Sequence, residues 1–482
     1  MEMLIGGRWI NKSEKIEVRD PYDNTLIDWV PRATAQDVQA AIAAAEKGFA
    51  ISRHLPVHQR IAILYRTAEI VKEQRESFAR TIAREGSKTI REARKEVARC
   101  IQTLQIAAEE ARRIVGETLP FDTMPGSENR VGYYYRVPIG IIVAITPFND
   151  PLNLVAHKLG PAIAGGNGVV LKPATATPLS ALKLGQAFLE AGLPPGILNI
   201  VTGYGHEIGE ALVTDERVRM ISFTGGYKAG LEITRKAGLK KIAMELGSNS
   251  PVIVLQDAPL EKAVEQTVSG AFWAAGQNCL GVQRVFIEAP IFEAFARRFV
   301  ERTRQLKVGN KLDERTDMGP MISEQEARRI ELWVQQAIER GARLLTGGKR
   351  QGAIYEPTVL TDVPPGVEVD CQEAFAPVVN LYRVSNLEEA IQRANQVPYG
   401  LQAGIFTRNI EMAFKAIKEL DVGGVMINDS SDYRVDLMPF GGVKRSGLGR
   451  EGIKFALQEM TEPKVVCFRL EENWRIGFPS PP

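Results

Sequence analysis

Hydrophobic and polar residues follow two patterns along the chain. One is that of amphipathic helices: Thr34 and Asp37 form a capping box, after which apolar residues repeat on one helical face. Residues 60–101 continue as a long, charge-rich helical pattern, which is typical of solvated helix faces. The other pattern consists of short apolar runs bounded by Gly and Pro, at residues 139–145, 168–171, 197–202, 220–223 and 252–255.

These apolar runs indicate buried strands, because each is followed by a helical pattern. Unbroken apolar strands spaced by helices predict a parallel sheet that is covered on both faces. We therefore expect a doubly wound α/β domain over at least residues 139–247. The alternation then restarts, which predicts a second α/β domain with helices at 260–276, 290–306 and 323–341 and a strand at 284–288.

Two further segments, residues 131–137 and 464–470, alternate like exposed strands. Strands that are remote from either core predict a small sheet arm that a neighbouring subunit covers. Residues 471–482 end in a Pro-rich piece and predict an extended or loosely ordered tail.

Composition narrows the class of protein. The 482 residues include 60 Lys and Arg against 58 Asp and Glu, a net charge of +2, which removes the simplest argument for nucleic acid or an anionic membrane as a partner. The four Cys and four His residues lack metal-ligand spacing, so we expect no metal site. The first residues show no signal-peptide pattern, and the apolar runs are too short to span a bilayer. We therefore expect a cytoplasmic enzyme.

Single residues near the ends of the expected strands are candidates for chemistry. Asn149 follows the strand at 139–145, at the sheet edge where ligands bind, although an Asn there is more often a turn residue. Glu245, among small apolar residues, is either paired structurally or serves as a base with a raised pKa. Cys279 follows a run of small residues and is either a buried hydrophobe or a nucleophile.

Glycine-rich turns indicate a dinucleotide site. Gly205 and Gly209 follow the strand at 197–202 and open a helix, where the backbone can approach a phosphate. Their spacing departs by one residue from the G-x-G-x-x-G fingerprint, so this turn alone is weak support. A second strand-to-helix turn, Phe223-Thr224-Gly225-Gly226, strengthens the case.

Seven short motifs include most of these residues: Pro147-Phe148-Asn149, Lys172-Pro173, Phe223-Thr224-Gly225, Glu245-Leu246-Gly247, Gly276-Gln277-Asn278-Cys279, Glu373-x-Phe375 and Pro439-Phe440-Gly441-Gly442. In this order they resemble the aldehyde dehydrogenase superfamily over nearly the whole chain. The resemblance implies a Rossmann-type cofactor domain over residues 1–118 and 138–247, a catalytic domain over 248–462, and an oligomerisation arm from 119–137 and 463–482. It also implies a homodimer or homotetramer.

The resemblance implies a role for each catalytic residue. Cys279 matches the nucleophile that attacks the aldehyde carbon, and Asn149 with the Cys279 N–H matches the pair that stabilises the oxyanion. Glu245 matches the base that activates water to hydrolyse the thioester. A thiolate is a good nucleophile and a good leaving group, so the two difficult steps become easier.

The cofactor residues follow from the same resemblance. Lys172 matches the lysine at the adenosine ribose, and Gly225 with Gly226 would lie under the pyrophosphate. Glu373 matches the residue that holds the nicotinamide ribose, with Phe375 packing beside it. Members that use NAD alone often carry Glu where this chain has Thr175, so we expect NADP to be accepted, with NAD as the competitor.

The expected substrate residues are polar. By the same resemblance, Asp150 and His157 stand at pocket positions that are often aromatic in the family, and Asn278 precedes the nucleophile. Arg434 is a candidate anion contact. Unless Asp150 and Arg434 simply pair with each other, these groups favour a short hydroxylated or anionic aldehyde over a fatty one. The candidates are lactaldehyde, sulfolactaldehyde, glyceraldehyde 3-phosphate and succinate semialdehyde.

Two alternatives remain open at this point. A coenzyme-A-acylating dehydrogenase would pass the thioester to a thiol, and Glu245 argues against it. A non-catalytic descendant of the fold would have no need of Cys279, Asn149 and Glu245 together.

Overall fold

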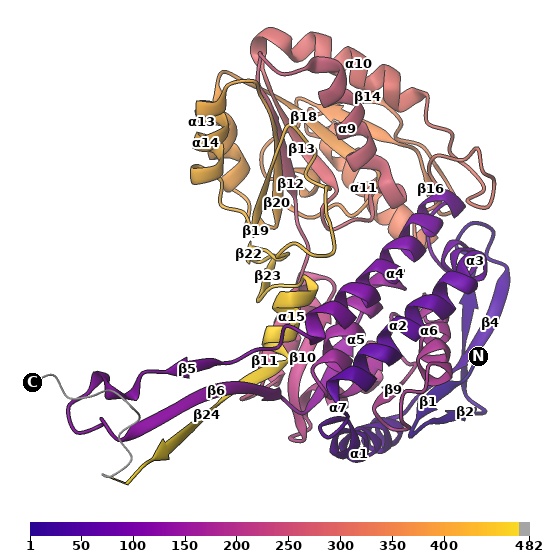
Figure 1. Cartoon of the computed structure of the whole chain (residues 1–482). Coiled ribbons are helices and arrows are strands. Elements are labelled where there is room, and N and C mark those ends of the chain that lie inside the picture. Colours follow the sequence, from indigo (N-terminus) through magenta and orange to yellow (C-terminus); the bar gives the residue numbers. More distant parts are fainter. Residues whose placement is uncertain (472–482) are drawn as a thin grey trace, which may run out of the picture.

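Two open, largely parallel sheets organise the chain (Figure 1). The computed structural model describes residues 1–471, and the rest of the expected tail lies outside this range. We call the unit around the eight-stranded sheet the first body and the unit around the seven-stranded sheet the second body. Parallel strands covered by helices on both faces confirm the expected doubly wound α/β fold.

The sheet of the first body has a parallel centre and antiparallel edges. Its strands, in spatial order, are β2 (Arg8–Ile10), β1 (Met3–Ile5), β9 (Leu198–Ile200), β8 (Gly168–Lys172), β7 (Ile141–Ile145), β10 (Val218–Thr224), β11 (Lys241–Glu245) and β23 (Gly447–Leu448).

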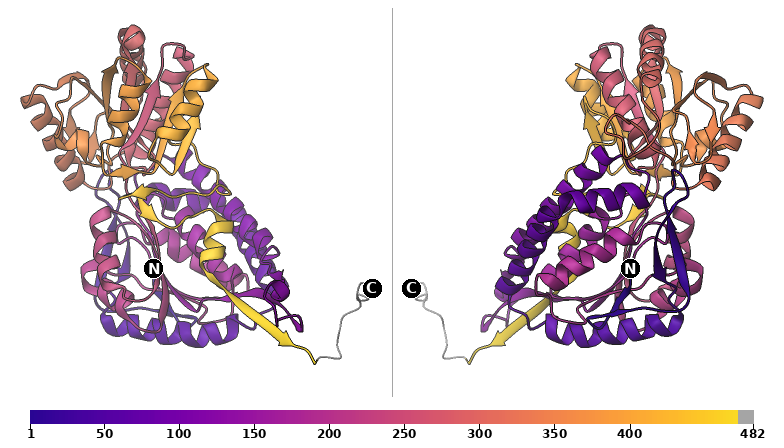
Figure 2. Two further views of the ribbon diagram at one scale, coloured as in Figure 1. Left: turned by 90° about the vertical axis from the view of Figure 1, so that its left-hand side faces the viewer. Right: turned by 90° about the vertical axis from the view of Figure 1, so that its right-hand side faces the viewer.

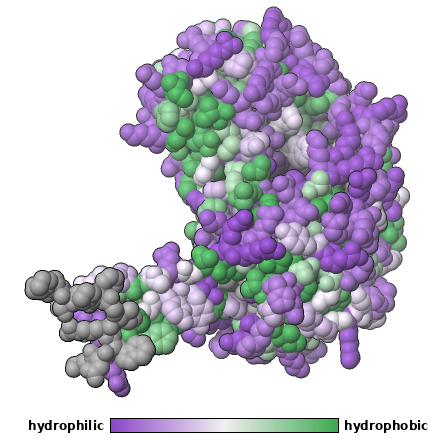
Figure 3. Space-filling view, viewed as in Figure 1, coloured by the Kyte–Doolittle hydropathy of each residue, from purple (hydrophilic) through white to green (hydrophobic). Residues whose placement is uncertain are grey.

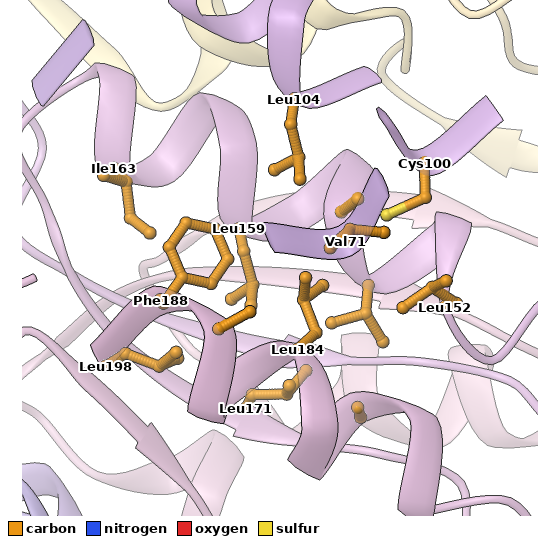
Figure 4. Packing of buried hydrophobic residues seen from close by; sticks show 14 of the residues in the cluster. Val71, Cys100, Leu104, Leu152, Leu159, Ile163, Leu171, Leu184, Phe188 and Leu198 are labelled. Carbon is orange, nitrogen blue, oxygen red and sulfur yellow. The ribbon is translucent and has the colours of Figure 1, made fainter. Parts of the chain in front are cut away.

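Helices cover both faces of this sheet. One face packs against α1 (Ala35–Ser52), α7 (Gly205–Thr214) and α8 (Tyr227–Lys236). On the other face, α5 (Asn153–Ala164) and α6 (Leu179–Glu190) contact the sheet, and α2 (Val57–Glu73), α3 (Arg75–Glu85), α4 (Ile90–Ala111) and α15 (Ile453–Glu459) pack over these two helices. Figure 4 shows part of the core on this face, in which Leu159 of α5 and Phe188 of α6 face one another among aliphatic side chains.

The sheet of the second body is similarly covered. Its strands, in spatial order, are β14 (Arg343–Thr346), β17 (Thr358–Thr361), β18 (Val378–Val384), β13 (Val282–Glu288), β12 (Ser250–Val254), β20 (Gln402–Phe406) and β21 (Gly424–Ile427). One face packs against α9 (Leu260–Phe272) and α10 (Phe292–Arg304). The other packs against α11 (Glu324–Glu339), α13 (Leu387–Asn395) and α14 (Ile410–Glu419).

The third unit is a three-stranded arm that projects from the first body (Figures 1 and 2). Its strands are β24 (Thr461–Arg469), β6 (Arg130–Pro138) and β5 (Glu117–Leu119). Tyr133, Val465 and Phe468 on this arm are exposed. The two strands expected at 131–137 and 464–470 are therefore paired with each other.

The structure differs from the expected elements in three places. The helical pattern over residues 60–101 is divided among α2, α3 and α4, because the chain turns at Gln74 and a new capping box starts α4 at Thr89. Helix α9 ends at Phe272, short of residue 276. Strand β23 and helix α15 pack on the first body, although the expected boundary at 462 assigned them to the second.

Within residues 1–471, every helix is too short or too polar to cross a lipid bilayer.

Candidate active site

The carboxyl ends of four neighbouring strands meet at one edge of the first sheet. Ile145 at the end of β7 is paired with Lys172 of β8 on one side and with Phe223 of β10 on the other. Thr224 is in turn paired with Glu245, the last residue of β11. This register places the expected cofactor and catalytic residues of the first body side by side, at the edge where parallel sheets bind ligands.

A cavity of about 290 Å³ opens beside this edge. It is lined by residues of both bodies and by the N-terminal half of α4. The expected residues that line it are Asn149, Asp150, Thr224, Glu245, Asn278, Cys279 and Arg434. The proposed nucleophile, oxyanion donor and base thus share one cavity, although they come from separate parts of the sequence.

A strained turn carries Cys279 into this cavity. Ala274 and Ala275 have φ values of 50° and 56°, and Gly276 follows at 69°. A left-handed conformation costs a residue other than Gly about 1–3 kcal/mol. A Cβ atom at Gly276 would lie 2.1 Å from the carbonyl oxygen of Ala376, so glycine is required there by space as well. The turn explains why α9 stops early and re-aims the chain toward the cavity.

The Cys279 side chain is half-buried at the cavity. Burial raises the pKa of this thiol to about 12, against an opposing effect of the Arg434 charge. The side chain packs with Leu280, Leu401 and Phe440. The thiol is therefore protonated at neutral pH, and formation of the thiolate needs a nearby base or positive charge.

Glu245 is suited to accept a proton. Its Oε2 atom is buried and has no hydrogen-bond partner within residues 1–471. Burial, followed by the charge of Glu451, raises the pKa of Glu245 well above its ordinary value. A Cβ atom at Gly441 would lie 2.9 Å from Oε1 of Glu245, so the Gly-Gly motif leaves room for this carboxyl group. A carboxylate with a raised pKa and a free oxygen can act as a general base on water.

The cofactor residues at the first sheet fit a dinucleotide. Lys172 is buried, and its Nζ donates to the Pro173 carbonyl oxygen at 3.1 Å. Burial lowers the pKa of Lys172 to about 8, a cost that an anionic or hydroxyl partner would offset. Helices α7 and α8 begin without a side-chain cap. The space around Gly205, Gly209 and Gly226 is open to a distance of 4 Å from an added Cβ, which leaves room for phosphate oxygens.

Thr175, Gly225 and Phe223 complete the part of the site formed by the first body. Thr175 is neutral, and its hydroxyl donates a hydrogen bond to the Gly203 carbonyl oxygen at 2.9 Å. An added Cβ at Gly225 would lie 2.5 Å from the ring of Phe223, which holds the turn close to that ring.

Glu373 and Phe375 approach from the second body. Glu373 accepts a hydrogen bond from the backbone N–H of Ser248 at 2.9 Å. Burial raises the pKa of Glu373 to about 7. The ring of Phe375 makes an edge-to-face contact with Phe148, beside Asn149, at 5.7 Å between centroids. This contact joins the expected nicotinamide end to the oxyanion loop.

Comparison with known proteins settles the family. The profile of the aldehyde dehydrogenase family matches residues 9–466. The chain belongs to this family. It is an NAD(P)-dependent aldehyde dehydrogenase by kinship, which confirms the predicted enzyme class and cofactor type.

Three relatives of this aldehyde dehydrogenase are instructive. Aspartate-semialdehyde dehydrogenase 1 of Pseudomonas canavaninivorans is 52% identical, over 94% of this chain and 97% of its own. The 3-sulfolactaldehyde dehydrogenase of Priestia aryabhattai is 47% identical, over 97% and 98%. The crystal structure of glyceraldehyde-3-phosphate dehydrogenase GapN of Methanocaldococcus jannaschii, complexed with NADP, is 43% identical, with a TM-score of 0.92 over 95% of this chain and all of that one.

Two of the expected substrate residues of this aldehyde dehydrogenase, Asp150 and Arg434, have different ion-pair partners. Asp150 pairs with Lys88 and Arg99, whereas Arg434 pairs with Glu451, so Asp150 and Arg434 do not pair with each other. Both still line the cavity.

His157 does not line the cavity. Its side chain is 1% exposed and contacts the carboxylate of Asp436 through Nε2 at 2.8 Å. The structure therefore makes His157 a buried support for the loop before Pro439, in contrast to its expected place at the substrate.

A buried ion-pair network that the sequence did not predict lies beside Glu245. Lys158 donates to Glu451 at 3.1 Å, and Arg434 donates to the same carboxylate at 3.2 Å. Burial opposes ionisation of Glu451, but the charges of Lys158 and Arg434 outweigh it and lower the pKa to about 2. A lysine inside the otherwise apolar segment of α5 was the available signal, because an unpaired buried lysine is costly.

Proposed function

We propose that this aldehyde dehydrogenase oxidises a short anionic aldehyde to its carboxylate, with NADP as the preferred cofactor. The proposal rests on the side chain of Arg434. Its side chain lines the cavity with Cys279, and its buried Nε donates to no acceptor within residues 1–471. A buried guanidinium N–H without a partner favours an anionic group on the substrate, because leaving such a donor unpaired is unfavourable.

The other charges of the cavity are consistent with this. Glu451 neutralises part of Arg434, and Asp150 is held by Lys88 and Arg99. Lys95, also at the cavity, lies over the ring of Trp273 and has no ion pair within the described chain. Burial raises the pKa of the two carboxyl groups of the cavity that have no ion pair within residues 1–471, Glu245 and Asp432, which favours their neutral forms and weakens their repulsion of an anion.

In the proposed reaction, the Cys279 thiol gives its proton to solvent water, a step that the positive charge of Arg434 favours, and the Cys279 sulfur then bonds to the aldehyde carbon. The oxyanion that forms accepts hydrogen bonds from the Asn149 amide and the Cys279 N–H, a contribution of roughly a hundredfold or more in rate. Bound NADP supplies the hydride acceptor. Glu245 then takes a proton from water, whose oxygen attacks the thioester carbon and releases the Cys279 thiolate as the carboxylate product forms.

The proposed preference for NADP rests on Lys172 and Thr175. Lys172 is buried and has no carboxylate partner within residues 1–471, and Thr175 is neutral. A 2′-phosphate would find a cation here and no like charge to repel it.

The names of three relatives agree with an anionic substrate. Aspartate semialdehyde, 3-sulfolactaldehyde and glyceraldehyde 3-phosphate all carry an anionic group, and these compounds name the three relatives described above. The lactaldehyde dehydrogenase of Methanocaldococcus jannaschii, 44% identical, is named for a neutral aldehyde. The preference for sulfolactaldehyde, glyceraldehyde 3-phosphate and succinate semialdehyde over lactaldehyde therefore rests on Arg434.

The test is a panel of short aldehydes, matched in length and with or without an anionic group, assayed with both cofactors. Arg434→Leu should raise KM for the anionic aldehydes at least tenfold and leave KM for neutral aldehydes within about threefold. Arg445→Leu, an exposed residue on the ring of Tyr227, is the matched control. Equal effects of Arg434→Leu on both classes would reject the anionic substrate. Product formation that requires coenzyme A would reject hydrolysis.

We further propose that the arm joins subunits into a homodimer or homotetramer. The arm exposes Val465 and Phe468, and α14 exposes Ile410, Phe414 and Ile417. Figure 3 shows hydrophobic side chains gathered over α13 and α14, on the side of the molecule that is hollowed toward the arm. Deleting the arm's apolar side chains, by Val465→Ser with Phe468→Ser, should yield monomers in sedimentation measurements.

A further inference from the structure

Two buried carboxylates on α4 reach the two loops that carry the proposed nucleophile and oxyanion donor. Glu92 and Glu96 are separated by one helical turn, so they lie on the same face of the helix. Both are nearly inaccessible to solvent. Neither belongs to the motifs that define the family resemblance, and neither lines the cavity.

Glu92 holds the strained turn before Cys279. Its Oε1 accepts a hydrogen bond from the backbone N–H of Ala274 at 2.9 Å. Its Oε2 accepts from the backbone N–H of Thr89 at 2.8 Å, as part of the capping box of α4. One carboxylate therefore ties the first left-handed residue of the turn to the start of a helix in the other body.

Glu96 holds the loop after Asn149 in the same way. Its Oε1 accepts from the backbone N–H groups of Leu152 and Asn153 at 2.8 and 3.0 Å, at the start of α5. Its Oε2 accepts from Lys88 at 2.8 Å, and Lys88 also contacts Asp150, the neighbour of Asn149. The oxyanion loop and the nucleophile turn are thus both anchored on α4.

The turn needs such an anchor because its backbone is strained. Ala274 and Ala275 would relax toward right-handed or extended conformations in an isolated peptide. Strained residues persist only where the surrounding structure holds them. Relaxation of the turn would displace Cys279, and a displacement of about 1 Å can cost about a hundredfold in rate.

We infer that Glu92 is a positioning residue of this enzyme: it anchors the Ala274–Ala275 turn so that Cys279 faces the oxyanion loop, which Glu96 anchors one helical turn away. The inference rests on the proposed function, because it assumes that Cys279 is the nucleophile. Glu92 acts on the nucleophile only through the backbone, so its loss should lower kcat more than it raises the KM for aldehyde.

The test compares Glu92→Ala, Glu92→Gln and a matched control, Thr89→Val. The control removes the hydroxyl of the α4 capping box but leaves the bond between Glu92 and Ala274. Glu92→Gln keeps one oxygen for Ala274 but loses the second acceptor. Each full-length variant is assayed for aldehyde oxidation with NADP, and amide hydrogen exchange is followed in peptides that cover residues 273–281.

Glu92→Ala should lower kcat at least tenfold with less than a threefold change in KM, and should accelerate exchange at residues 273–281. Glu92→Gln should show a smaller loss in the same direction, and this variant decides the question if Glu92→Ala does not fold. Thr89→Val should keep the kcat of the unsubstituted enzyme and its exchange at residues 273–281.

Equal kcat and equal local exchange in the Glu92 and Thr89 variants would overturn the inference. Faster local exchange in Glu92→Ala with undiminished kcat would also overturn it, because the turn would then be anchored without effect on the reaction. A chain that oxidises no aldehyde, even without substitution, would instead overturn the proposed function, and the exchange data would remain interpretable.

Discussion

Glu245 and Glu451 are buried carboxyl groups of one cavity, and their pKa values are displaced in opposite directions. Burial acts on both. Glu451 is paired with Lys158 and Arg434 and stays ionised, whereas Glu245 has no ion pair within residues 1–471 and feels the negative charge of its neighbour. The pair therefore divides the roles of fixed charge and titrating base between two residues of the same type.

The acid limb of the pH profile should report this pair. Glu245 must be ionised to act as a base, so a raised pKa means that hydrolysis declines as the pH falls through that value. Glu451→Gln removes the negative neighbour, which lowers the pKa of Glu245 and moves the acid limb of kcat to lower pH. Lys158→Met removes a cation that favours ionisation of Glu245 and should move the limb to higher pH. Shifts of the same sign in both variants would contradict the assignment.

Glu245→Gln should separate the two chemical steps. Hydride transfer does not need the base, so we expect a rapid first turnover of NADPH formation followed by a steady rate about a hundredfold or more below that of the unsubstituted enzyme. Cys279→Ser, the matched comparison, should show no first turnover. The measurement is stopped-flow absorbance of the reduced cofactor. Loss of the first turnover in Glu245→Gln would place the base before hydride transfer.

Thr175→Glu should reverse the cofactor preference. A carboxylate three residues from Lys172 would repel a 2′-phosphate, so kcat/KM for NADP should fall at least tenfold while that for NAD is retained or rises. Thr175→Val removes the hydrogen bond to Gly203 without adding charge and should leave the ratio of the two specificity constants within about threefold. An unchanged ratio in Thr175→Glu would show that the adenosine end binds elsewhere.

Lys311→Met should destabilise the fold. The Lys311 ammonium group is buried and contacts Asp20 at 2.7 Å and the carbonyl oxygens of Arg84 and Gly86 at 2.8 and 2.7 Å. Without it, a buried carboxylate and two carbonyl groups lose their partner, which typically costs about 3 kcal/mol. Urea unfolding should show a lower midpoint than in Lys262→Met, an exposed control on α9. Equal midpoints would mean that water replaces the ammonium group without loss.

The candidate site could be predicted where a local signal marked the residue. Asn149 follows the expected strand β7, and Glu245, among small apolar residues, is the last residue of β11; the register of β7, β10 and β11 brings both to one edge of the sheet. Cys279 could be predicted only from the family motif. The structure adds that a left-handed turn, in an Ala-rich segment with high helix propensity, delivers it to the cavity.

The features that escaped prediction depend on contacts between distant parts of the chain. Lys158 and Glu451 are separated by 293 positions, and no pattern along the sequence links them. His157 was expected at the substrate, but its buried ring contacts the carboxylate of Asp436, which is 279 positions away in the sequence. The helix expected to reach residue 276 stops at Phe272 because tertiary contacts, including that of Glu92 with Ala274, outweigh local preference.

The pairing of Glu245 with Gly447 has a consequence for the architecture of the chain. The polypeptide leaves the first sheet after β11 and returns to it as the adjacent strand β23, so the whole second body is an insertion whose two ends are hydrogen-bonded neighbours. A single cut at either junction would therefore interrupt the sheet of the first body, and neither body would be separated from the other as a continuous segment. Exchange of this module between homologues requires two junctions, and both would fall within a few residues of Glu245, the proposed general base.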